Sequence, residues 1–443
     1  MEKHARSILF WSFFFVFLLI APLVILYTSG YRYNPATKRL AQTGGISVTS
    51  IPRGAALTLN GKRTKYLSPA LLRFVPPGAA TLRISKEEFL PLDMRFPVVR
   101  RQTALLEDIV LWRRSVPTPL EQDPTLLTPN HRGTTYALAV TSGNWTEVWM
   151  VDFRDPKKRL LITRLPSLAT GRLIIEWSPD DEWILLVPKD RPADSLFVRF
   201  DGTQPARTAE TISKALTSPL SSITWIEGDP HRLLATTKNG SLLWEPGRAA
   251  ENIPVEAVLA KRGERIYTLA TDKNRTVVME GYGLEGMPLA SLPPSSYRFA
   301  ESPETYLTLS DKTSLVVLSL ASKENSLVLK TDATMFAWSP DKKSIAYSNG
   351  YTTALLHLPS GKTTILSHTS DPSTALAWHP KGTALVIAEA KELVAYDLSV
   401  GRAVTPLTAA RGVSTIIFEK DGEAFWFLGN VNEANGLYQI RVR

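Results

Sequence analysis

The sequence predicts an all-β protein behind one N-terminal transmembrane helix, with a small β-sandwich followed by a β-propeller. Three observations carry this prediction. A run of twenty residues near the N-terminus has no charge, residues 44–114 alternate between apolar and polar side chains, and a unit of about 40 residues then recurs. With 44% hydrophobic and 21% charged residues, the 443-residue chain has the composition of folded domains.

Composition limits the chemistry and locates the charge. The chain has no cysteine, which excludes disulfides and thiolates and leaves histidine or carboxylates as the ligands of any metal. The formal net charge is +9. Residues 1–120 contain 17 Lys and Arg against 6 Asp and Glu, a net of +11, whereas residues 121–443 contain 34 against 36, a net of −2. The basic character therefore belongs to the first quarter of the chain.

Residues 8–28 are predicted to form the transmembrane helix. Twenty residues at about 1.5 Å per residue span about 30 Å, the hydrocarbon thickness of a bilayer. A signal peptide has a shorter apolar core of about 7–15 residues, so an uncleaved anchor is favoured over cleavage. Basic residues flank both ends and do not decide the orientation. The seven-residue head favours residues 1–7 as a short cytoplasmic tail, which predicts a single-pass protein of the cell membrane with most of the chain extracytoplasmic.

Residues 44–114 are predicted to form the small β domain. Apolar residues alternate or cluster in residues 46–51 and 56–59, as in half-buried strands. Asn60-Gly61 favours a type I′ hairpin, because both residue types tolerate the positive φ that this turn requires. Residues 76–78, Pro-Pro-Gly, indicate a second turn before another alternating strand. The pattern indicates a compact β-sandwich.

This region resembles the PEGA domain, a family of small β-sandwich modules of prokaryotic cell-surface proteins. The residues that carry the resemblance are Pro52, Gly54, Ala55, Asn60-Gly61, Ser68-Pro69, Pro77-Gly78 and Lys86. The sequence departs from the family pattern at Arg53 in place of glutamate, at Ala80 in place of an aromatic residue, and at Glu88-Phe89 in place of Gly-Tyr. The resemblance covers about 15% of the chain. It implies a surface module for interaction and carries over no catalytic residue.

Basic side chains dominate the predicted β domain. The simplest interpretation is a solvated face, and the alternative is attachment to anionic lipid headgroups or wall polymers, to which each basic residue contributes about 1 kcal/mol near a charged surface. The candidate residues for this anionic surface are Lys62, Arg63, Lys65, Arg73, Arg83 and Lys86. No nucleic-acid partner is expected, because aromatic residues that could stack on bases are sparse here.

Residues 126–443 are predicted to form the propeller, and residues 115–125 a linker or a closing strand. The tetrapeptide W-S-P-D occurs at residues 177–180 and again at 338–341, and weaker copies keep an aromatic or apolar residue in register. These anchor positions are Leu127, Trp177, Trp225, Leu259, Phe299, Trp338, Trp378 and Phe418. Their spacings of 50, 48, 34, 40, 39, 40 and 40 residues are typical of one blade per repeat. Eight anchors favour eight blades, and the longer spacings leave seven as the alternative.

Within one unit, residues 334–368 divide into four short strands separated by turns. The pattern resembles TolB-like and WD-repeat propellers, whose first hairpin often contains W-S-P-D-G, and the resemblance covers roughly residues 120–443. It implies a fold and says little about function. The chain ends in a third strand that starts near Gly436, so closing the ring requires a fourth strand from residues near 115–125.

The repeats offer little chemistry. There is no H-E-x-x-H, no G-x-S-x-G and no glycine-rich phosphate loop, so no metal, cofactor or enzymatic activity is predicted. Asp180 and Asp341 follow a proline in a hairpin and are interpreted as turn residues. Glu176, before Trp177, is the exception, because the units with an aromatic anchor compared with it carry Thr, Ala or Ile at this position. A carboxylate there is either buried with a partner or faces the central channel as a ligand contact.

The sequence thus predicts a non-enzymatic, membrane-anchored protein of the cell envelope, whose β domain and propeller form a binding or scaffolding platform. The expected partners are membrane lipid, through the N-terminal helix, and an envelope protein or polysaccharide. The alternative is an envelope glycan hydrolase or lyase that uses carboxylates of the propeller channel.

Overall fold

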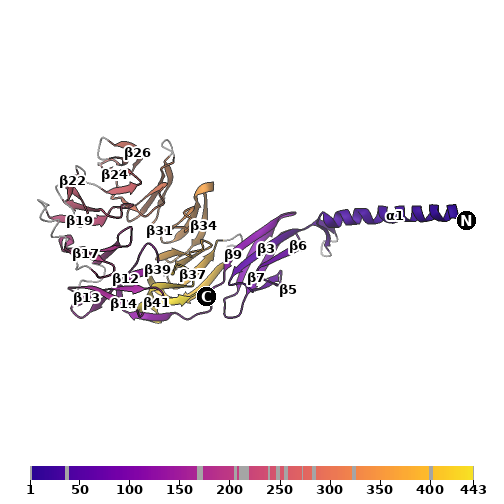
Figure 1. The fold of residues 1–443 in the computed structure, drawn as a ribbon, viewed down its shortest axis with the longest axis horizontal. Coiled ribbons are helices and arrows are strands. Elements are labelled where there is room, and N and C mark those ends of the chain that lie inside the picture. The colour runs from indigo at the N-terminus through magenta and orange to yellow at the C-terminus, as the bar shows by residue number, and fades with distance from the viewer. Residues whose placement is uncertain are drawn as a thin grey trace.

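The computed structural model describes most of the chain as one helix followed by β-structure (Figure 1). The residues that it does not describe are 1, 35–38, 167–172, 204–206, 209–218, 238–239, 246–249, 254–257, 272, 282–285, 322–325, 399–402 and 443.

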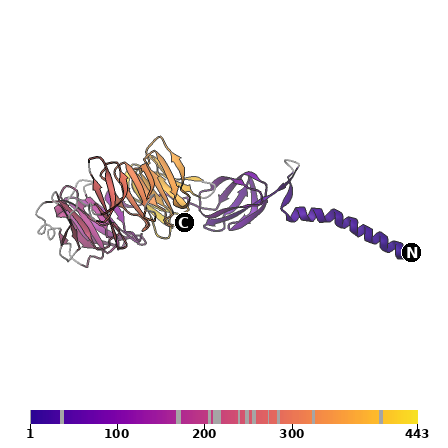
Figure 2. The same ribbon diagram turned by 90° about the horizontal axis from the view of Figure 1, so that it is seen from above.

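The N-terminal helix α1 (Glu2–Thr28) extends away from the rest of the molecule (Figures 1 and 2). Its segment Ser7–Thr28 has a mean hydropathy of 2.8 and none of it is buried. By length and composition this segment could cross a membrane, and a signal sequence would have the same character. The predicted apolar helix is therefore present, with its whole apolar surface uncovered.

A short hairpin connects α1 to the first β domain. It consists of β1 (Tyr31–Asn34) and β2 (Arg39–Gln42). Arg32 donates a hydrogen bond of 2.8 Å to the carbonyl of Tyr27, and its guanidinium lies 3.6 Å from the Tyr27 ring centroid and 4.0 Å from that of Phe74. Because Phe74 belongs to the β domain, Arg32 joins the end of the helix to that domain.

Two sheets form the β domain, defined here as residues 44–110. The first has the order β6-β3-β9 and the second β5-β4-β7-β8. Their strands are β3 (Gly44–Ile51), β4 (Ala56–Leu59), β5 (Lys62–Leu67), β6 (Ala70–Val75), β7 (Gly78–Ser85), β8 (Leu92–Val98) and β9 (Thr103–Val110). Side chains of both sheets share one hydrophobic core, in which Ile46 and Val48 of β3 pack with Leu82 and Ile84 of β7. At the β4–β5 turn, Asn60 and Gly61 have φ of 48° and 76°, as their sequence predicts.

Eight four-stranded antiparallel sheets follow in the described residues, numbered here 1 to 8 in chain order. Sheet 1 consists of β11 (Pro124–Pro129), β12 (Thr135–Ser142), β13 (Trp145–Asp152) and β14 (Arg159–Pro166), and sheet 2 of β15 (Leu173–Trp177), β16 (Trp183–Pro188), β17 (Leu196–Arg199) and β18 (Arg207–Thr208). Sheet 3 consists of β19 (Leu220–Trp225), β20 (Leu233–Thr237), β21 (Gly240–Trp244) and β22 (Glu251–Ile253), and sheet 4 of β23 (Leu259–Arg262), β24 (Arg265–Thr271), β25 (Thr276–Glu280) and β26 (Met287–Leu292).

Sheets 5 to 8 repeat this arrangement. Sheet 5 consists of β27 (Arg298–Ala300), β28 (Tyr306–Ser310), β29 (Ser314–Ser319) and β30 (Leu327–Asp332), and sheet 6 of β31 (Met335–Trp338), β32 (Ser344–Ser348), β33 (Thr352–His357) and β34 (Lys362–His368). Sheet 7 consists of β35 (Ala375–Trp378), β36 (Ala384–Ala388), β37 (Glu392–Asp397) and β38 (Val404–Ala409), and sheet 8 of β39 (Arg411–Phe418), β40 (Ala424–Val431), β41 (Ala434–Arg441) and β10 (Thr118–Gln122). Each anchor position of the sequence repeat lies in the first strand of one sheet.

The sheets are arranged around a common centre (Figure 1). Each shares a hydrophobic cluster with the next, from sheets 1 and 2 to sheets 7 and 8. Sheets 8 and 1 also share one, in which the Trp426 ring centroid lies 5.0 Å from that of Tyr136. Sheet 8 takes its outer strand β10 from the opposite end of the domain, since Thr118 pairs with Gln439 of β41. The seam between the last and first sheets is therefore held by strand pairing and by a shared core.

The two W-S-P-D segments form the same hairpin in sheets 2 and 6. Asp180 accepts hydrogen bonds from the Ser178 hydroxyl at 2.5 Å and from the backbone N–H of Glu182 at 3.0 Å. Asp341 accepts the equivalent bonds at 2.6 and 3.1 Å. Both carboxylates thus stabilise their own turns.

Trp112 connects the β domain to sheets 7 and 8. It is 2% exposed and packs in the hydrophobic cluster that these two sheets share, with its ring centroid 6.3 Å from those of Phe418 and Phe425. Backbone bonds add to this contact, since the N–H of Arg113 donates to the carbonyl of Val442 at 3.1 Å.

Candidate functional site

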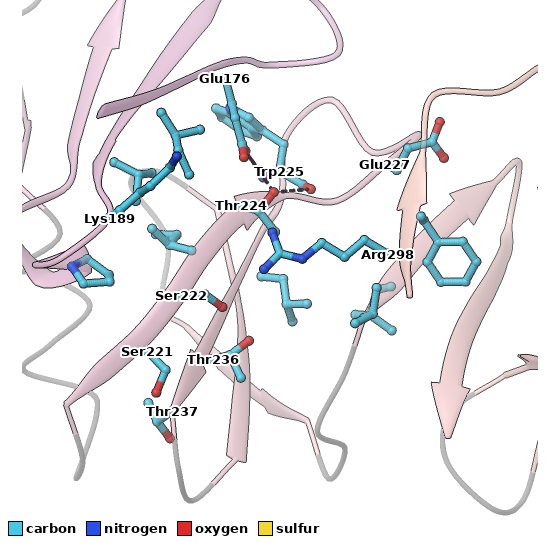
Figure 3. A pocket seen from close by; sticks show the side chains of 18 residues that line it. Glu176, Lys189, Ser221, Ser222, Thr224, Trp225, Glu227, Thr236, Thr237 and Arg298 are labelled. Carbon is cyan, nitrogen blue, oxygen red and sulfur yellow. Dashed lines mark hydrogen bonds between the residues drawn. The ribbon is translucent and has the colours of Figure 1, made fainter. Parts of the chain in front are cut away.

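A pocket of about 670 Å³ lies among the first strands of sheets 2 to 5 (Figure 3). Glu176 comes from β15, Thr224 from β19 and Arg298 from β27. These residues are far apart in the sequence, and the arrangement of the sheets brings them to one cavity. Its size is within the range of about 300–1,000 Å³ that is usual for small-molecule sites.

Glu176 both contacts the neighbouring sheet and lines the pocket. Its Oε2 accepts a hydrogen bond of 2.8 Å from the Thr224 hydroxyl and one of 3.3 Å from the backbone N–H of Trp225, so it joins sheet 2 to sheet 3. Its Oε1 has no hydrogen-bond partner among the described residues. Burial raises the pKa of Glu176 and outweighs these hydrogen bonds and the charge of Arg298, which lower it. The pocket therefore favours the neutral carboxylic acid.

The contacts between sheets 2 and 3 explain why the fold needs the Glu176 carboxyl group. The indole N–H of Trp177 donates to the Thr128 carbonyl at 3.1 Å, and that of Trp378 donates to the Ala337 carbonyl at 2.9 Å, so each tryptophan contacts the preceding sheet. The indole nitrogen of Trp225 is buried without such a partner among the described residues. The Glu176 carboxyl group supplies the link between sheets 2 and 3 instead.

Two cationic side chains line the pocket without a partner. Arg298 and Lys189 are both exposed, and neither has a hydrogen bond or an ion pair within the part of the chain that the structure describes. Figure 3 shows the Arg298 guanidinium extending across the pocket toward the strand that carries Thr224. No nitrogen of Arg298 lies within 4.0 Å of the Glu176 carboxyl oxygens. The remaining polar lining consists of the hydroxyl groups of Ser221, Ser222, Thr224, Thr236 and Thr237.

Glu227, the other carboxylate of the described lining, is already neutralised. It forms a close ion pair with Arg262, which also donates to the Ser302 hydroxyl at 2.6 Å and to the Tyr306 carbonyl at 3.3 Å. Burial raises the pKa of Glu227 against the opposing effect of Arg262. This ion pair ties sheets 3, 4 and 5 together.

Sequence reasoning finds Glu176 and misses Arg298. A signal for Arg298 exists, because it precedes the anchor Phe299 as Glu176 precedes Trp177. Glu176 is therefore not the only charged residue at this position of the repeat. Two opposite charges in equivalent positions of two first strands come to the same cavity.

The six basic candidates of the β domain are distributed over both of its sheets. Lys62, Arg63 and Lys65 lie on the edge strand β5, and Arg83 lies on β7 of the same sheet, whereas Arg73 lies on β6 of the other sheet. Two of them have partners, because Arg83 lies 3.7 Å from Asp93 and Lys86 donates a 2.5 Å bond to the Arg53 carbonyl. Arg63 and Arg83 both pair in register with Thr58, which places them on one row of the sheet.

Comparison with known proteins shows a fold and no family. No family model matches the chain, and no curated protein sequence matches it significantly. Among solved structures, the C-terminal WD40 domain of Sif2 is similar with a TM-score of 0.50 and 12% identity, covering 74% of this chain and 98% of that one. Sqt1 of Saccharomyces cerevisiae gives 0.48 and 10%, covering 74% and 98%. The Dos1 propeller gives 0.47 and 13%, covering 72% and 92%.

The similarity to the Sif2 domain confirms the predicted class of fold, a WD40-type β-propeller. At 12% identity it carries no residue role and no activity to this chain. The fold and the pocket together define a propeller with a ligand-sized cavity among its first strands.

Proposed function

We propose that the protein is a membrane-anchored binding platform of the cell envelope, whose propeller takes its partner at the pocket lined by Glu176, Lys189 and Arg298, called here the channel pocket. The observation that carries this proposal is the presence of Arg298 and Lys189 in the pocket without partners among the described residues. Exposed cations need no partner for stability, but two that face one concave site give it a positive potential that attracts an anionic partner. Two cations left open to a cavity favour a bound partner.

The propeller is proposed to have eight blades, formed by residues 118–441. Eight four-stranded sheets and the eight anchor positions support this number. The β10–β41 pairing supports a closed ring, because it joins both ends of the domain in one sheet. A closed ring gives the loops and the channel a rigid support, which suits partner recognition.

The membrane-anchored position is supported by the N-terminal quarter of the chain. The segment Ser7–Thr28 has no protein cover for its apolar side chains, which a bilayer would provide. The β domain, PEGA-like in sequence, is joined to the helix through Arg32 and to the propeller through Trp112. This arrangement would present the propeller at the membrane surface, where an envelope protein or glycan is the expected partner.

An envelope glycan hydrolase or lyase is the second candidate, because the raised pKa of Glu176 suits a general acid. Most glycosidases need a second free carboxyl group about 5–9.5 Å from the first. The other carboxylate among the described lining residues, Glu227, is paired with Arg262. The described lining therefore supports binding better than hydrolysis.

The test is co-sedimentation of the full chain, in nanodiscs, with isolated envelope material. We expect retention that falls at least fivefold in the double variant Arg298→Gln, Lys189→Gln, with no soluble fragment released. Arg154→Gln with Lys157→Gln is the matched control, because both residues are exposed and lie outside the pocket lining. Equal retention by the pocket variant would exclude the channel as the binding site. Release of fragments that disappears in Glu176→Gln would instead establish the enzyme.

A further inference from the structure

The charge of the pocket can be balanced from its described residues. Glu227 and Arg262 neutralise each other in an ion pair. The surroundings of Glu176 favour its neutral form. Arg298 and Lys189 outnumber Glu176, so the described lining is cationic even with Glu176 ionised, although residues 121–443 as a whole carry a formal net charge of −2. The pocket is locally cationic in a domain that is not, which favours an anionic ligand.

The rest of the lining narrows the ligand further. The hydroxyls of Ser221, Ser222 and Thr236 can donate and accept hydrogen bonds, whereas those of Thr224 and Thr237 already donate to Glu176 and to the Gly240 carbonyl. Phe299 adds an aromatic surface beside Arg298. A cavity of about 670 Å³ with this lining is suited to a compact molecule with several hydroxyl groups.

We infer that the channel pocket binds a hydroxylated small molecule that carries one carboxylate or phosphate group, as an acidic sugar does, with Arg298 as its principal anion contact. The planar guanidinium matches either anion with two parallel hydrogen bonds. Lys189 provides the second positive charge, and the hydroxyls of Ser221, Ser222 and Thr236 meet the ligand hydroxyls. This inference rests on the proposed binding function and names the chemistry of its ligand.

A zwitterionic ligand such as a free amino acid is the closest competitor, because Glu176 and Arg298 both line the pocket. An ammonium group would need an ionised Glu176, and two features oppose this. Glu176 is buried in a way that favours its neutral form, and Lys189 would repel the ammonium group. The Oε1 atom of Glu176, which has no hydrogen-bond partner among the described residues, is better placed to hydrogen-bond a ligand hydroxyl.

Isothermal titration of the full chain in nanodiscs tests the inference with three matched probes: D-glucuronate, D-glucose 6-phosphate and D-glucose. We expect at least one anionic sugar to bind tenfold or more tightly than glucose. Its affinity should fall at least tenfold in Arg298→Gln and remain within twofold in the control Arg154→Gln. The preference between glucuronate and glucose 6-phosphate identifies the anionic group. Because Arg298 is exposed, Arg298→Gln should keep the wild-type thermal midpoint, which separates lost binding from lost folding.

Three results would overturn the inference. Glucose could bind as tightly as the anionic sugars, no sugar could bind at all, or only an acidic hexapeptide of Asp and Glu could bind, which would point to a protein partner. The failure of the binding platform itself gives a different result. If retention on envelope material persists and depends on Arg298 while the sugars do not bind, the platform stands and the acidic-sugar ligand is wrong.

Discussion

At the scale of single residues, Glu176 combines two demands in one carboxyl group. Oε2 serves the fold through Thr224 and the backbone of Trp225, and Oε1 is left to the pocket. Burial of this group makes its ionised form costly to the folded state. Ionisation of the Glu176 carboxyl group therefore affects both the free energy of unfolding and the charge of the pocket.

Glu176→Gln should make the protein less sensitive to alkaline pH. The folded pKa of Glu176 is raised above its usual 4.5, so the folded state keeps its full stability below about pH 4.5 and loses part of it as pH rises through the folded pKa. Glutamine keeps the acceptor oxygen and cannot ionise. The variant's unfolding midpoint should therefore exceed that of the wild type by at least about 2 °C at pH 8, and by less at pH 4. Thermal circular dichroism checks this, with the exposed Glu264→Gln as control; a difference independent of pH would contradict it.

Asp181 is a second residue whose role lies between sheets. Its buried carboxylate, 4% exposed, accepts the backbone N–H groups of His131 at 2.8 Å and of Arg132 at 3.0 Å from the turn of sheet 1. Asp181→Asn keeps a residue that tolerates the local φ of 66° but replaces one acceptor oxygen with an amide donor. We expect a loss of about 1–3 kcal/mol in the free energy of unfolding, measured with urea.

Asp341→Asn is the matched control for this prediction, because Asp341 occupies the position of Asp180 in the hairpin of sheet 6 and its hydrogen bonds stay within its own turn. An equal or larger loss in that variant would show that the turn matters and the link between sheets does not. The sequence Asp180-Asp181 predicts the turn chemistry of the first residue. It cannot predict that of the second, because its partners lie 50 and 49 positions away in another repeat.

At the scale of elements, local sequence signals were sufficient wherever the structure repeats. The eight anchors mark first strands because each sheet packs this position against its neighbours, with six anchors buried and Phe299 and Trp338 partly buried. The requirement for a closing strand follows from counting strands in the last unit, which has three before the chain ends. The pocket could not be predicted in this way, because a sequence repeat predicts only the features that its units share, and the pocket depends on residues that they do not share. Arg298 and Lys189 are charged residues of this kind, which distinguish their sheets from the others.

Truncation of residues 436–443 should destabilise the whole propeller. It removes most of β41, and with it the pairing that holds β10 to β40 and joins the two ends of the domain. The loss should approach the total stability of a domain, about 5–15 kcal/mol, because the sheets around the seam unfold cooperatively. Thermal unfolding followed at the β-sheet band measures it. A normal midpoint in the truncated protein would show that the ring does not depend on this closure.

At the scale of the whole molecule, the two β-rich regions are coupled through a buried tryptophan and through hydrogen bonds, one of them at the surface. Trp112 packs into the cluster of sheets 7 and 8, and the hydroxyl of Thr383 donates to the Asp108 carbonyl at 3.2 Å. On the other side, Arg32 fixes the β domain to the end of α1. A helix anchored in a membrane would thus determine the position of the propeller as well.

Trp112→Ala should weaken this coupling. Removing a fully buried tryptophan costs about 3–5 kcal/mol, and here the cavity opens between the β domain and the propeller. We expect faster proteolysis in residues 113–117 and a split of the thermal transition into two. Trp145→Ala is the control, because Trp145 is 51% exposed and should change little. A single unchanged transition would mean that the two domains are held by other contacts.

The orientation of the anchor can be tested because the chain has no cysteine. A single cysteine can be placed at either end, as His4→Cys before the apolar segment or Asn435→Cys at the exposed start of β41 in sheet 8. In intact cells, a membrane-impermeant maleimide should label Asn435→Cys and should reach His4→Cys only after permeabilisation. The opposite pattern would place the propeller inside the cell. Loss of the His4→Cys peptide from the mature protein would identify α1 as a cleaved signal sequence and would exclude the proposed membrane anchor.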